Sequence, residues 1–572
     1  MRRERGAVAA MACAGVLALA GCMGIPTSGP VQEGEVQLTE PDLAIPIPTG
    51  PREGATADEV VRGFLAAAAD GVYDEYQTAM EFLSLPARSD WQPWASTTVY
   101  GTADPEVAVD ETDGAAVAVV TVEPVATVDD AGRYTESAGG TPVPLTLSLA
   151  RSAGEWRITD LPDGVLTSYN TFANSHREVG VYFASLDGQV LVPEMRWFQN
   201  SKVVEEATRA LVEGPSPWLR DGVRTGVPGG VSPSLAGVTI DASNVLTLNL
   251  ASDIAGTPEV SDRDLLQEQL EATLAGTRAV ISDIVVTLNG RPWAPTSDVP
   301  ELEVNPAPRS GPFVLVDDAE GVAVLTEVDS GELVPVADVA PLTGMRASSP
   351  AISLDGTVRV VLDDRQRLVL LPPDAGEPTT LLEGAALLPP SVDRHGWVWT
   401  AEQFPTGGLT AVDASREPVP VAADWLTGRE VRSIRVSRDG ARVAVAYQSP
   451  EGPSVIEVAA IVRDEEGRPQ GLGAERLVVG ASLDDVVEVS WLNESSLAVL
   501  GRGDGVDDLT AYEVPLGGRS SSKAPQPGAV NIAATPERIY LADEEGFLRR
   551  NQASTWVPVV PVSGLRDPAF PG

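Results

Sequence analysis

Cys22 is the residue of this 572-residue sequence whose surroundings point most directly to covalent chemistry, and it is one of only two cysteines. Leu19, Ala20 and Gly21 stand directly before it, at the end of the only long apolar run. Three arginines lie within the first five residues and residues 6 to 20 are almost wholly apolar, which is the layout of a secretory signal peptide. The run is about five residues shorter than the roughly 20 that span a bilayer. We therefore expect a signal and not a permanent transmembrane helix.

The string from Leu19 to Cys22 resembles the lipobox of bacterial lipoproteins, in which the signal is cut directly before the cysteine. That chemistry needs a thiol for a thioether to diacylglycerol, small preceding residues that fit the peptidase, and a new amino terminus that a fatty acid such as palmitate can acylate. The sequence meets all three conditions. We predict a signal peptide over residues 1–21, cleavage after the Leu19, Ala20 and Gly21 motif, and lipidation of Cys22. The alternative is an ordinary signal peptide with a chance cysteine.

The other reactive side chains form no catalytic or metal-binding pattern. His176 and His395 are the only histidines and stand far apart, which excludes a Cys/His zinc site. The sequence has no Gly-x-Ser-x-Gly motif and no glycine-rich phosphate loop ending in lysine. GDGVDDL, from Gly503, has carboxylates that could meet calcium but lacks the full ligand spacing, so a polar loop is expected. We predict no enzyme and no catalytic, cofactor-binding or metal-binding residue, although a carboxylate pair for glycoside cleavage is invisible in a sequence.

The charge of the chain argues against one class of partner. Forty basic and 82 acidic residues give a net charge of −42, and removal of residues 1–21 takes away three arginines and one glutamate, which leaves −44. A chain this acidic is repelled by nucleic-acid phosphates and by anionic lipid headgroups. We expect no nucleic-acid partner, and a membrane link that depends on the lipid itself.

The sequence after the predicted signal indicates a tether followed by an α+β domain. Residues 22–54 are rich in proline and have no helical period, so we expect a lipidated, extended tether. Thr56 and Glu59 have capping-box spacing at the start of one helix, and the apolar spacing of residues 76–83 predicts a second. Short strands rich in valine and threonine follow. Two helices and a curved antiparallel sheet over residues 55–166 resemble the cone-shaped NTF2-like domains, with an interaction or spacer role expected.

An α/β domain is predicted over residues 175–300. VGVYFASLDGQVLVPEMRW, from Val179, predicts a hairpin whose strands are joined by the two-residue turn Asp187-Gly188. A helix ending at Gly214, a second hairpin, a helix from Ser261 to Gly276 and a returning strand follow. This order of apolar residues and glycines resembles the GerM-type domain of bacterial envelope proteins. The resemblance implies a fold and a location but no active-site residue.

The last part of the chain predicts an all-β propeller over residues 306–572. NPAPRSGP, Asn305 to Pro312, is a linker by composition, and the helical patterns stop after it. Strand-turn-strand repeats then recur, and their turn glycines Gly356, Gly396 and Gly440 are 40 and 44 residues apart. This period suits four-stranded propeller blades. We expect about six blades, with five or seven left open, in a unit that folds by itself.

The order of lipobox, tether, cone-like domain, GerM-type domain and propeller resembles the LpqB lipoproteins of actinobacteria over essentially the whole mature chain. The resemblance implies lipid anchorage at the outer face of the cytoplasmic membrane. It also implies an accessory or adaptor role toward the extracytoplasmic domain of the sensor histidine kinase MtrB, in the MtrA–MtrB two-component system, with effects on cell-envelope homeostasis and division. The residues alone support a membrane-tethered, multi-domain binder.

The competing hypothesis is an envelope carbohydrate-binding or hydrolytic enzyme that uses a propeller face. Acids and aromatics converging on one face would favour that enzyme. A smooth propeller mouth and an apolar groove between domains would favour the adaptor.

Overall fold

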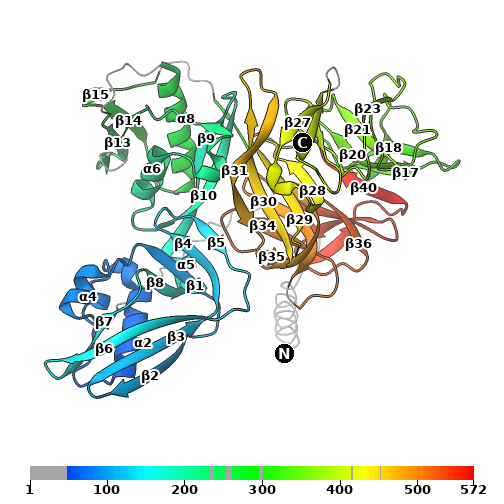
Figure 1. The fold of residues 1–572 in the computed structure, drawn as a ribbon. Helices are drawn as coiled ribbons and strands as arrows, with labels where there is room; N and C mark the ends of the chain where they lie inside the picture. Colours follow the sequence, from blue (N-terminus) through cyan, green and yellow to red (C-terminus); the bar gives the residue numbers. More distant parts are fainter. Residues whose placement is uncertain are drawn as a thin grey trace, which may run out of the picture. The chain divides into compact units, whose positions relative to one another are not determined.

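The computed structural model describes residues 48–231, 237–252, 260–295, 301–413, 417–450, 452–503 and 505–572. The chain divides into a unit of Met1–Pro46 and a compact unit of Ile47–Gly572. The second unit contains three domains in chain order, called here the N-terminal domain, the middle domain and the propeller (Figure 1). The predicted signal and most of the predicted tether lie outside the described residues.

The N-terminal domain begins with the helix that the capping box predicts, α2 (Ala57–Ala69). The Thr56 hydroxyl accepts a hydrogen bond from the Glu59 amide at 3.3 Å, and the Glu59 carboxylate accepts one from the Thr56 amide at 2.8 Å. Val60, Val61 and Phe64 lie on the buried face of α2. The prediction of this helix and its cap is confirmed.

The prediction of one continuous second helix over residues 76–83 is wrong. The chain instead forms a 3-10 turn, η1 (Gly71–Tyr73), and two short helices, α3 (Gln77–Met80) and α4 (Leu85–Asp90). Tyr76 precedes α3 with a left-handed φ of 61°. Its ring is buried and meets Trp91 and Trp94 edge to face, at centroid distances of 5.9 and 4.5 Å. Burial of this ring therefore overrides the local helical period.

The strands of the N-terminal domain form two four-stranded sheets, where the sequence predicts one curved antiparallel sheet. The order β2-β3-β6-β7 is antiparallel, whereas β5-β4-β1-β8 contains a parallel pair, β1 with β8. The likeness to NTF2-like domains stays a prediction. The bounds are β1 (Ser96–Tyr100), β2 (Glu106–Thr112), β3 (Ala115–Val122), β4 (Pro124–Asp129), β5 (Tyr134–Glu136), β6 (Val143–Ser152), β7 (Glu155–Asp160) and β8 (Val165–Ser168), followed by α5 (Tyr169–Ser175).

The middle domain has the predicted order of hairpins and helices. β9 (His176–Ser185) and β10 (Val190–Gln199) form the predicted antiparallel hairpin, and helices α6 (Val203–Glu213) and α8 (Val260–Gly276) lie beside β9 (Figure 1). The predicted two-residue turn is wrong, because the four residues 186–189 connect the strands and the Gly188 amide donates to the Ser185 carbonyl at 2.8 Å. β13 pairs antiparallel with β12 and parallel with β14. The other bounds are α7 (Pro217–Arg220), β11 (Val223–Arg224), β12 (Gly237–Ile240), β13 (Val245–Leu250), β14 (Asp283–Leu288), β15 (Arg291–Pro292) and β16 (Glu303–Val304).

The propeller consists of four-stranded antiparallel units. Four of its sheets have four strands each, and an eight-stranded sheet joins two further such units through a single bridge between β27 and β31, at Ala422 and Gly471. The repeat glycines Gly356, Gly396 and Gly440 have φ of 74°, 80° and 72°, so each occupies the left-handed turn position that favours glycine.

The innermost strands β40, β20, β24, β28, β32 and β36 contact one another in sequence around a ring. The C-terminal strand β40 closes this ring by pairing antiparallel with β17, the first strand of the propeller. Among the described residues beyond Pro312, the helical structure is limited to one 3-10 turn, η3 (Asp424–Leu426).

The propeller strands have the following bounds: β17 (Phe313–Asp317), β18 (Ala323–Asp329), β19 (Glu332–Pro335), β20 (Ala347–Ile352), β21 (Arg359–Asp363), β22 (Arg367–Leu370), β23 (Thr379–Glu383), β24 (Ser391–Val392), β25 (Trp397–Thr400), β26 (Gly408–Asp413), β27 (Val419–Ala422), β28 (Glu430–Val436), β29 (Arg442–Gln448), β30 (Ser454–Arg463), β31 (Pro469–Val479), β32 (Leu483–Asn493), β33 (Ser496–Gly503), β34 (Thr510–Pro515), β35 (Ser521–Ser522), β36 (Ala529–Thr535), β37 (Arg538–Asp543), β38 (Leu548–Gln552), β39 (Thr555–Pro558) and β40 (Leu565–Ala569).

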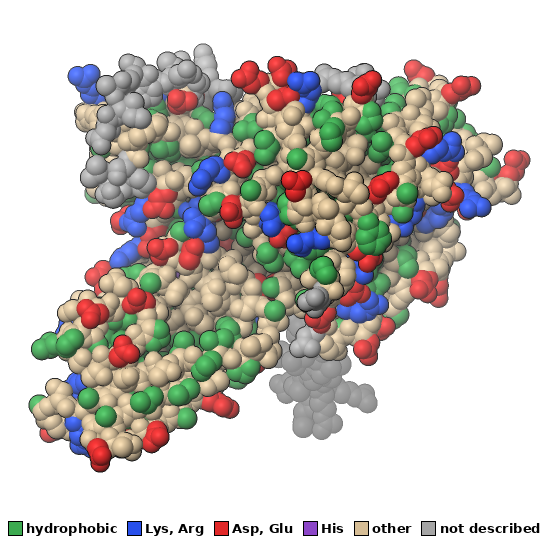
Figure 2. Space-filling view, in the orientation of Figure 1, with side chains coloured by type: hydrophobic (Ala, Val, Ile, Leu, Met, Phe, Trp, Pro, Cys, Tyr) green, Lys and Arg blue, Asp and Glu red, His purple; other side chains and the backbone are tan. Residues whose placement is uncertain are grey.

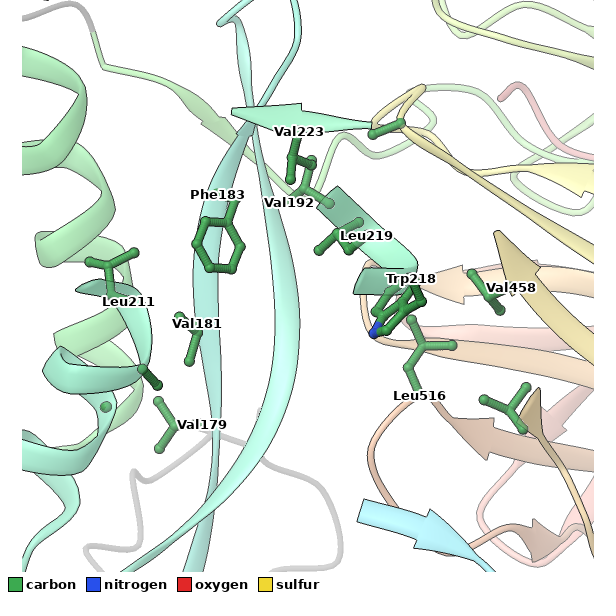
Figure 3. Packing of buried hydrophobic residues seen from close by; sticks show 14 of the residues in the cluster. Val179, Val181, Phe183, Val192, Leu211, Trp218, Leu219, Val223, Val458 and Leu516 are labelled. Atoms are coloured by element: carbon green, nitrogen blue, oxygen red, sulfur yellow. The ribbon is translucent and has the colours of Figure 1, made fainter. Parts of the chain in front are cut away.

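One buried apolar cluster continues from the middle domain into the propeller. Trp218 and Leu219 of α7 belong to it together with Val458 of β30 and Leu516, and Figure 3 shows α7 between the β9–β10 hairpin and the propeller strands. The backbone of Gly222 approaches the propeller so closely that a Cβ atom there would lie 2.6 Å from the Ala441 carbonyl oxygen. The structure therefore does not support the expectation of a propeller that is complete by itself.

Candidate functional site

The predicted lipidation residue Cys22 and the cleavage motif Leu19, Ala20 and Gly21 lie outside the described residues. Across the described ranges, no helix is long and apolar enough to cross a membrane. Among the described residues, the candidate site residues lie at the boundaries between the three domains.

Trp197 of β10 lies where the three domains meet. Its amide donates to the Gly132 carbonyl of the N-terminal domain at 2.7 Å, and its indole Nε1 donates to the Gly517 carbonyl of the propeller at 2.6 Å. Its ring lies 4.9 Å from the Phe172 ring and 6.2 Å from the Tyr134 ring, measured between centroids. One side chain of the middle domain thus contacts both neighbours.

Glu136 at the end of β5 adds a direct link between the N-terminal domain and the propeller. Its carboxylate accepts hydrogen bonds from the Ser520 amide at 2.8 Å, from the Ser520 hydroxyl at 2.7 Å and from the Ser482 hydroxyl at 3.3 Å. A charged acceptor with three donors is a strong contact. It holds the β4–β5 hairpin against the propeller.

A buried charge network joins the middle domain to the propeller. Arg442 has no exposed surface; it is paired with Asp439 and donates to the Pro193 carbonyl of the middle domain at 3.2 Å and to the Glu494 carbonyl at 2.7 Å. The Arg442 guanidinium also lies 5.0 Å from the centroid of the Trp491 ring. Removing the middle domain would take away one of its acceptors.

Glu178, opposite Trp197 in the β9–β10 register, gives the protein a predicted pH dependence. Burial raises the pKa of its carboxyl group from 4.5 to about 7. Because the folded pKa is the higher one, protonated Glu178 stabilises the fold fully below about pH 4.5, and this contribution is lost as the pH rises to 7.

We expect Glu178→Gln to stabilise the protein by roughly 2–3 kcal/mol at pH 8 and to leave its stability unchanged at pH 4. Thermal unfolding at both pH values measures this difference. Glu111→Gln, an exposed position at the end of β2, is the matched control and should change neither melting curve. An equal effect of Glu178→Gln at the two pH values would contradict the prediction.

A pocket of about 330 Å³ opens between the N-terminal and middle domains. We call it the seam pocket; it is lined by residues of both domains, among them Tyr76, Trp94, Asp129, Gln199, Lys202 and Glu206. The Lys202 amine lies 5.1 Å from the centroid of the Trp94 ring and 3.3 Å from the Glu75 carboxylate. Burial raises the pKa of Glu206. Aromatic, cationic and acidic groups therefore meet in this pocket.

A smaller cavity of about 50 Å³ lies among the innermost propeller strands. Arg435 pairs with Glu488 at 2.8 Å, and the Glu488 carboxylate also accepts from the Ile532 amide at 3.0 Å. Arg438 donates to the carbonyl oxygens of Leu492, Trp491 and Ala534 at 3.2, 2.9 and 2.8 Å. These charged groups are occupied in holding the propeller strands together.

The two histidines lie at different domain boundaries. His176 lines the seam pocket, contacts the Ser175 hydroxyl at 2.9 Å and stacks on Phe172, and burial lowers its pKa to about 4. His395 lies in a propeller turn, 3.9 Å from the Asp187 carboxylate of the middle domain, and burial lowers its pKa. Both contacts fit a packing role.

The GDGVDDL segment is only partly described, because residue 504 lies outside the described ranges. The Gly503 amide donates to the Tyr512 hydroxyl at 3.0 Å. Within the described ranges, no group of three or more His, Cys, Asp or Glu side chains is arranged to hold a metal ion.

Comparison with known families identifies all three domains. Residues 50–173 match the family model described as "Lipoprotein LpqB, N-terminal domain", and residues 323–571 match "Lipoprotein LpqB beta-propeller domain". Residues 180–293 match the Germane model, described as "Sporulation and spore germination". The chain belongs to the LpqB lipoprotein family.

Individual LpqB relatives match over almost their whole length. The chain is 28% identical to "Lipoprotein LpqB" of Cutibacterium acnes over 590 residues, which cover 97% of each chain. It is 29% identical to that of Thermobifida fusca over 642 residues, 97% of this chain and 98% of the relative. The predicted family is thus confirmed, as are its multi-domain fold, its GerM-type (Germane) domain and its β-propeller. LpqB membership implies a membrane-anchored lipoprotein.

The seam pocket of this LpqB-family chain was not predicted from the sequence. Its residues come from segments separated by more than 100 positions, such as Trp94 and Lys202, and no short motif contains them. The one signal in the sequence is the rarity of lysine, since Lys202 is one of only two among 40 basic residues.

Proposed function

We propose that this LpqB-family lipoprotein is a non-enzymatic accessory protein that binds the extracytoplasmic domain of the MtrB sensor histidine kinase of the MtrA–MtrB system. It acts from the outer face of the cytoplasmic membrane, where a lipid on Cys22 anchors it, and it influences cell-envelope homeostasis and division. The family resemblance supplies the identity of the partner. The observation that supports a binding role is the junction at Trp197, where side-chain and backbone contacts hold three domains together as one surface.

The surface charge fits a protein that binds selectively and stays soluble outside the membrane. Acidic side chains are spread over the face shown in Figure 2, with basic ones between them, and no single-sign patch dominates that face. A dispersed excess of acid repels nucleic acid and anionic lipid headgroups. This charge favours attachment to the membrane through the lipid alone, and it favours a protein as the binding partner.

The lipid anchor and the tether make a weak interface sufficient. Both partners are confined to one membrane surface, which restricts the volume in which they meet, so the effective concentration reaches about millimolar. The kinase interface then needs little intrinsic affinity. We expect weak binding in solution and effective binding at the membrane.

The alternative, an envelope carbohydrate-binding or hydrolytic enzyme on a propeller face, has less support. Glu488 is committed to Arg435 and to the backbone amide of Ile532, and Arg438 to three carbonyl oxygens. A hydrolytic site needs carboxyl groups free to exchange protons with a substrate. The cavity among the innermost strands is better explained as packing.

Deletion of residues 23–46 tests the adaptor role. The segment from residue 48 onward is kept because the Gly54 amide donates to the Glu155 carboxylate at 3.1 Å, so it packs on the N-terminal domain. We expect the deletion to lower kinase-dependent reporter output severalfold while the protein stays folded and membrane-bound. A Gly/Ser segment of equal length in place of residues 23–46 is the matched control and should restore the output. Normal output from the shortened protein would contradict the proposal.

A further inference from the structure

In the seam pocket, the ring of Trp94 already contacts a cation of the protein itself, the Lys202 ammonium group. The Trp94 side chain is 42% exposed, and Tyr76 supports its ring edge to face at 4.5 Å. The Lys202 ammonium group lies 5.1 Å from the centre of that ring. A tryptophan face attracts ammonium and guanidinium groups through its quadrupole. The geometry of a cation site is thus present within the pocket.

The charges around this ring favour a second cation. Acidic residues of the pocket outnumber basic ones; the acids are Asp129, Asp130, Glu205, Glu206 and Glu213, and the bases are Lys202 and Arg209. Arg209 is paired with Glu205 at 2.7 Å and Lys202 with Glu75 at 3.3 Å. Glu206 has no ion pair within 4.0 Å among the described residues, although Lys202 and Arg209 lie near enough to influence its carboxylate. Its carboxylate is available for a positive ligand.

An unsatisfied acceptor lies beside Glu206. Gln199 lines the pocket and is only 6% exposed, and its side-chain Oε1 has no hydrogen-bond partner among the described residues. The backbone amide of the same residue donates to the Glu206 carboxylate at 3.1 Å. A buried acceptor without a donor destabilises the structure that contains it, because its lost hydration is not replaced. A ligand that brings N–H donors would remove this cost.

We infer that the seam pocket binds a basic side chain, most simply the guanidinium of an arginine, presented by a partner polypeptide. The ring of Trp94, the carboxylate of Glu206 and the amide oxygen of Gln199 all favour a cation with N–H donors, and a volume of about 330 Å³ accommodates such a side chain. The net charge of −42 attracts basic partners. Lys202 acts as an internal occupant that a partner's side chain displaces from the Trp94 ring. The inference rests on the proposed binding role and deepens it.

The test is binding of Nα-acetylarginine amide, with Nα-acetylcitrulline amide as the uncharged isostere, to the purified mature chain carrying Cys22→Ser. Titration calorimetry or ligand-observed NMR at low salt measures both probes. We expect binding of the arginine probe alone. Trp94→Ala and Glu206→Gln should each weaken it at least about fivefold, whereas Lys202→Ala should strengthen it severalfold because it vacates the ring. Glu111→Gln, exposed and outside the pocket, should have no effect.

Equal binding of the two probes, or equal binding of the arginine probe to the wild type and to Trp94→Ala, would overturn the inference. Putrescine is the third probe: if it bound more tightly than the arginine probe, the occupant would be a small free amine and the polypeptide source would be wrong. Thermal unfolding of each variant shows whether it is folded. Retained binding of the arginine probe without any kinase contact in cells would contradict the proposed function and leave this site standing.

Discussion

A fragment of residues 306–572 is expected to aggregate, whereas a fragment of residues 169–572 is expected to fold and to unfold cooperatively. The shorter fragment removes Trp218 and Leu219 from the apolar cluster that they share with Val458 and Leu516. Loss of a fully buried leucine or tryptophan side chain costs about 2–5 kcal/mol in cores of this kind. The propeller side chains that Trp218 and Leu219 cover would be exposed in this fragment, and exposed apolar surface promotes association.

Size-exclusion chromatography and circular dichroism of the two fragments measure this effect. A point variant tests it within the complete chain: Leu219→Asp places a charge at a position with no exposed surface and should prevent stable folding, while Leu85→Asp, at a position 82% exposed, should be neutral. A monomeric fragment 306–572 that melts at the temperature of the whole chain would show that the shared cluster does not matter.

Cys22→Ser is expected to move the mature protein from the membrane fraction to the soluble fraction. The substitution removes the thiol that would carry diacylglycerol, and no helix among the described residues could replace the anchor. Fractionation in detergent-free, high-salt buffer measures the shift. Cys13→Ser is the matched control. It changes the other cysteine of the chain, which lies within the predicted signal, and should leave the protein on the membrane. A Cys22→Ser protein that stayed fully membrane-bound would exclude the lipid as the anchor.

Local signals predicted the elements that depend on local energetics. The Thr56 and Glu59 capping box, the β9–β10 hairpin and the left-handed glycines of the propeller repeats each depend on residues close in the sequence, and the structure contains all of them. Such interactions need no information from distant parts of the chain. The order of domains was predictable for the same reason, because each domain has its own period of apolar residues.

Features that depend on distant residues were not predictable. Tyr76 leaves its helical pattern because Trp91 and Trp94 bury its ring. The composition of the segment Asn305 to Pro312 indicates a linker, yet the apolar cluster continues across the domain boundary through Trp218. The same holds for the seam pocket, whose aromatic face and whose lysine lie on different domains. Local sequence patterns predict helices, strands and caps, but they do not show which distant residues a side chain contacts.

The most direct test of the adaptor role is site-specific photo-crosslinking in living cells. A photoreactive residue replaces, one at a time, the highly exposed apolar side chains Leu85, Val280 and Phe404, one in each domain, and adducts are identified by mass spectrometry. We predict that at least one position gives an adduct with the extracytoplasmic domain of the sensor kinase, and that Cys22→Ser abolishes it. Absence of a kinase adduct from all three positions, in cells where the protein is folded and membrane-bound, would contradict the account.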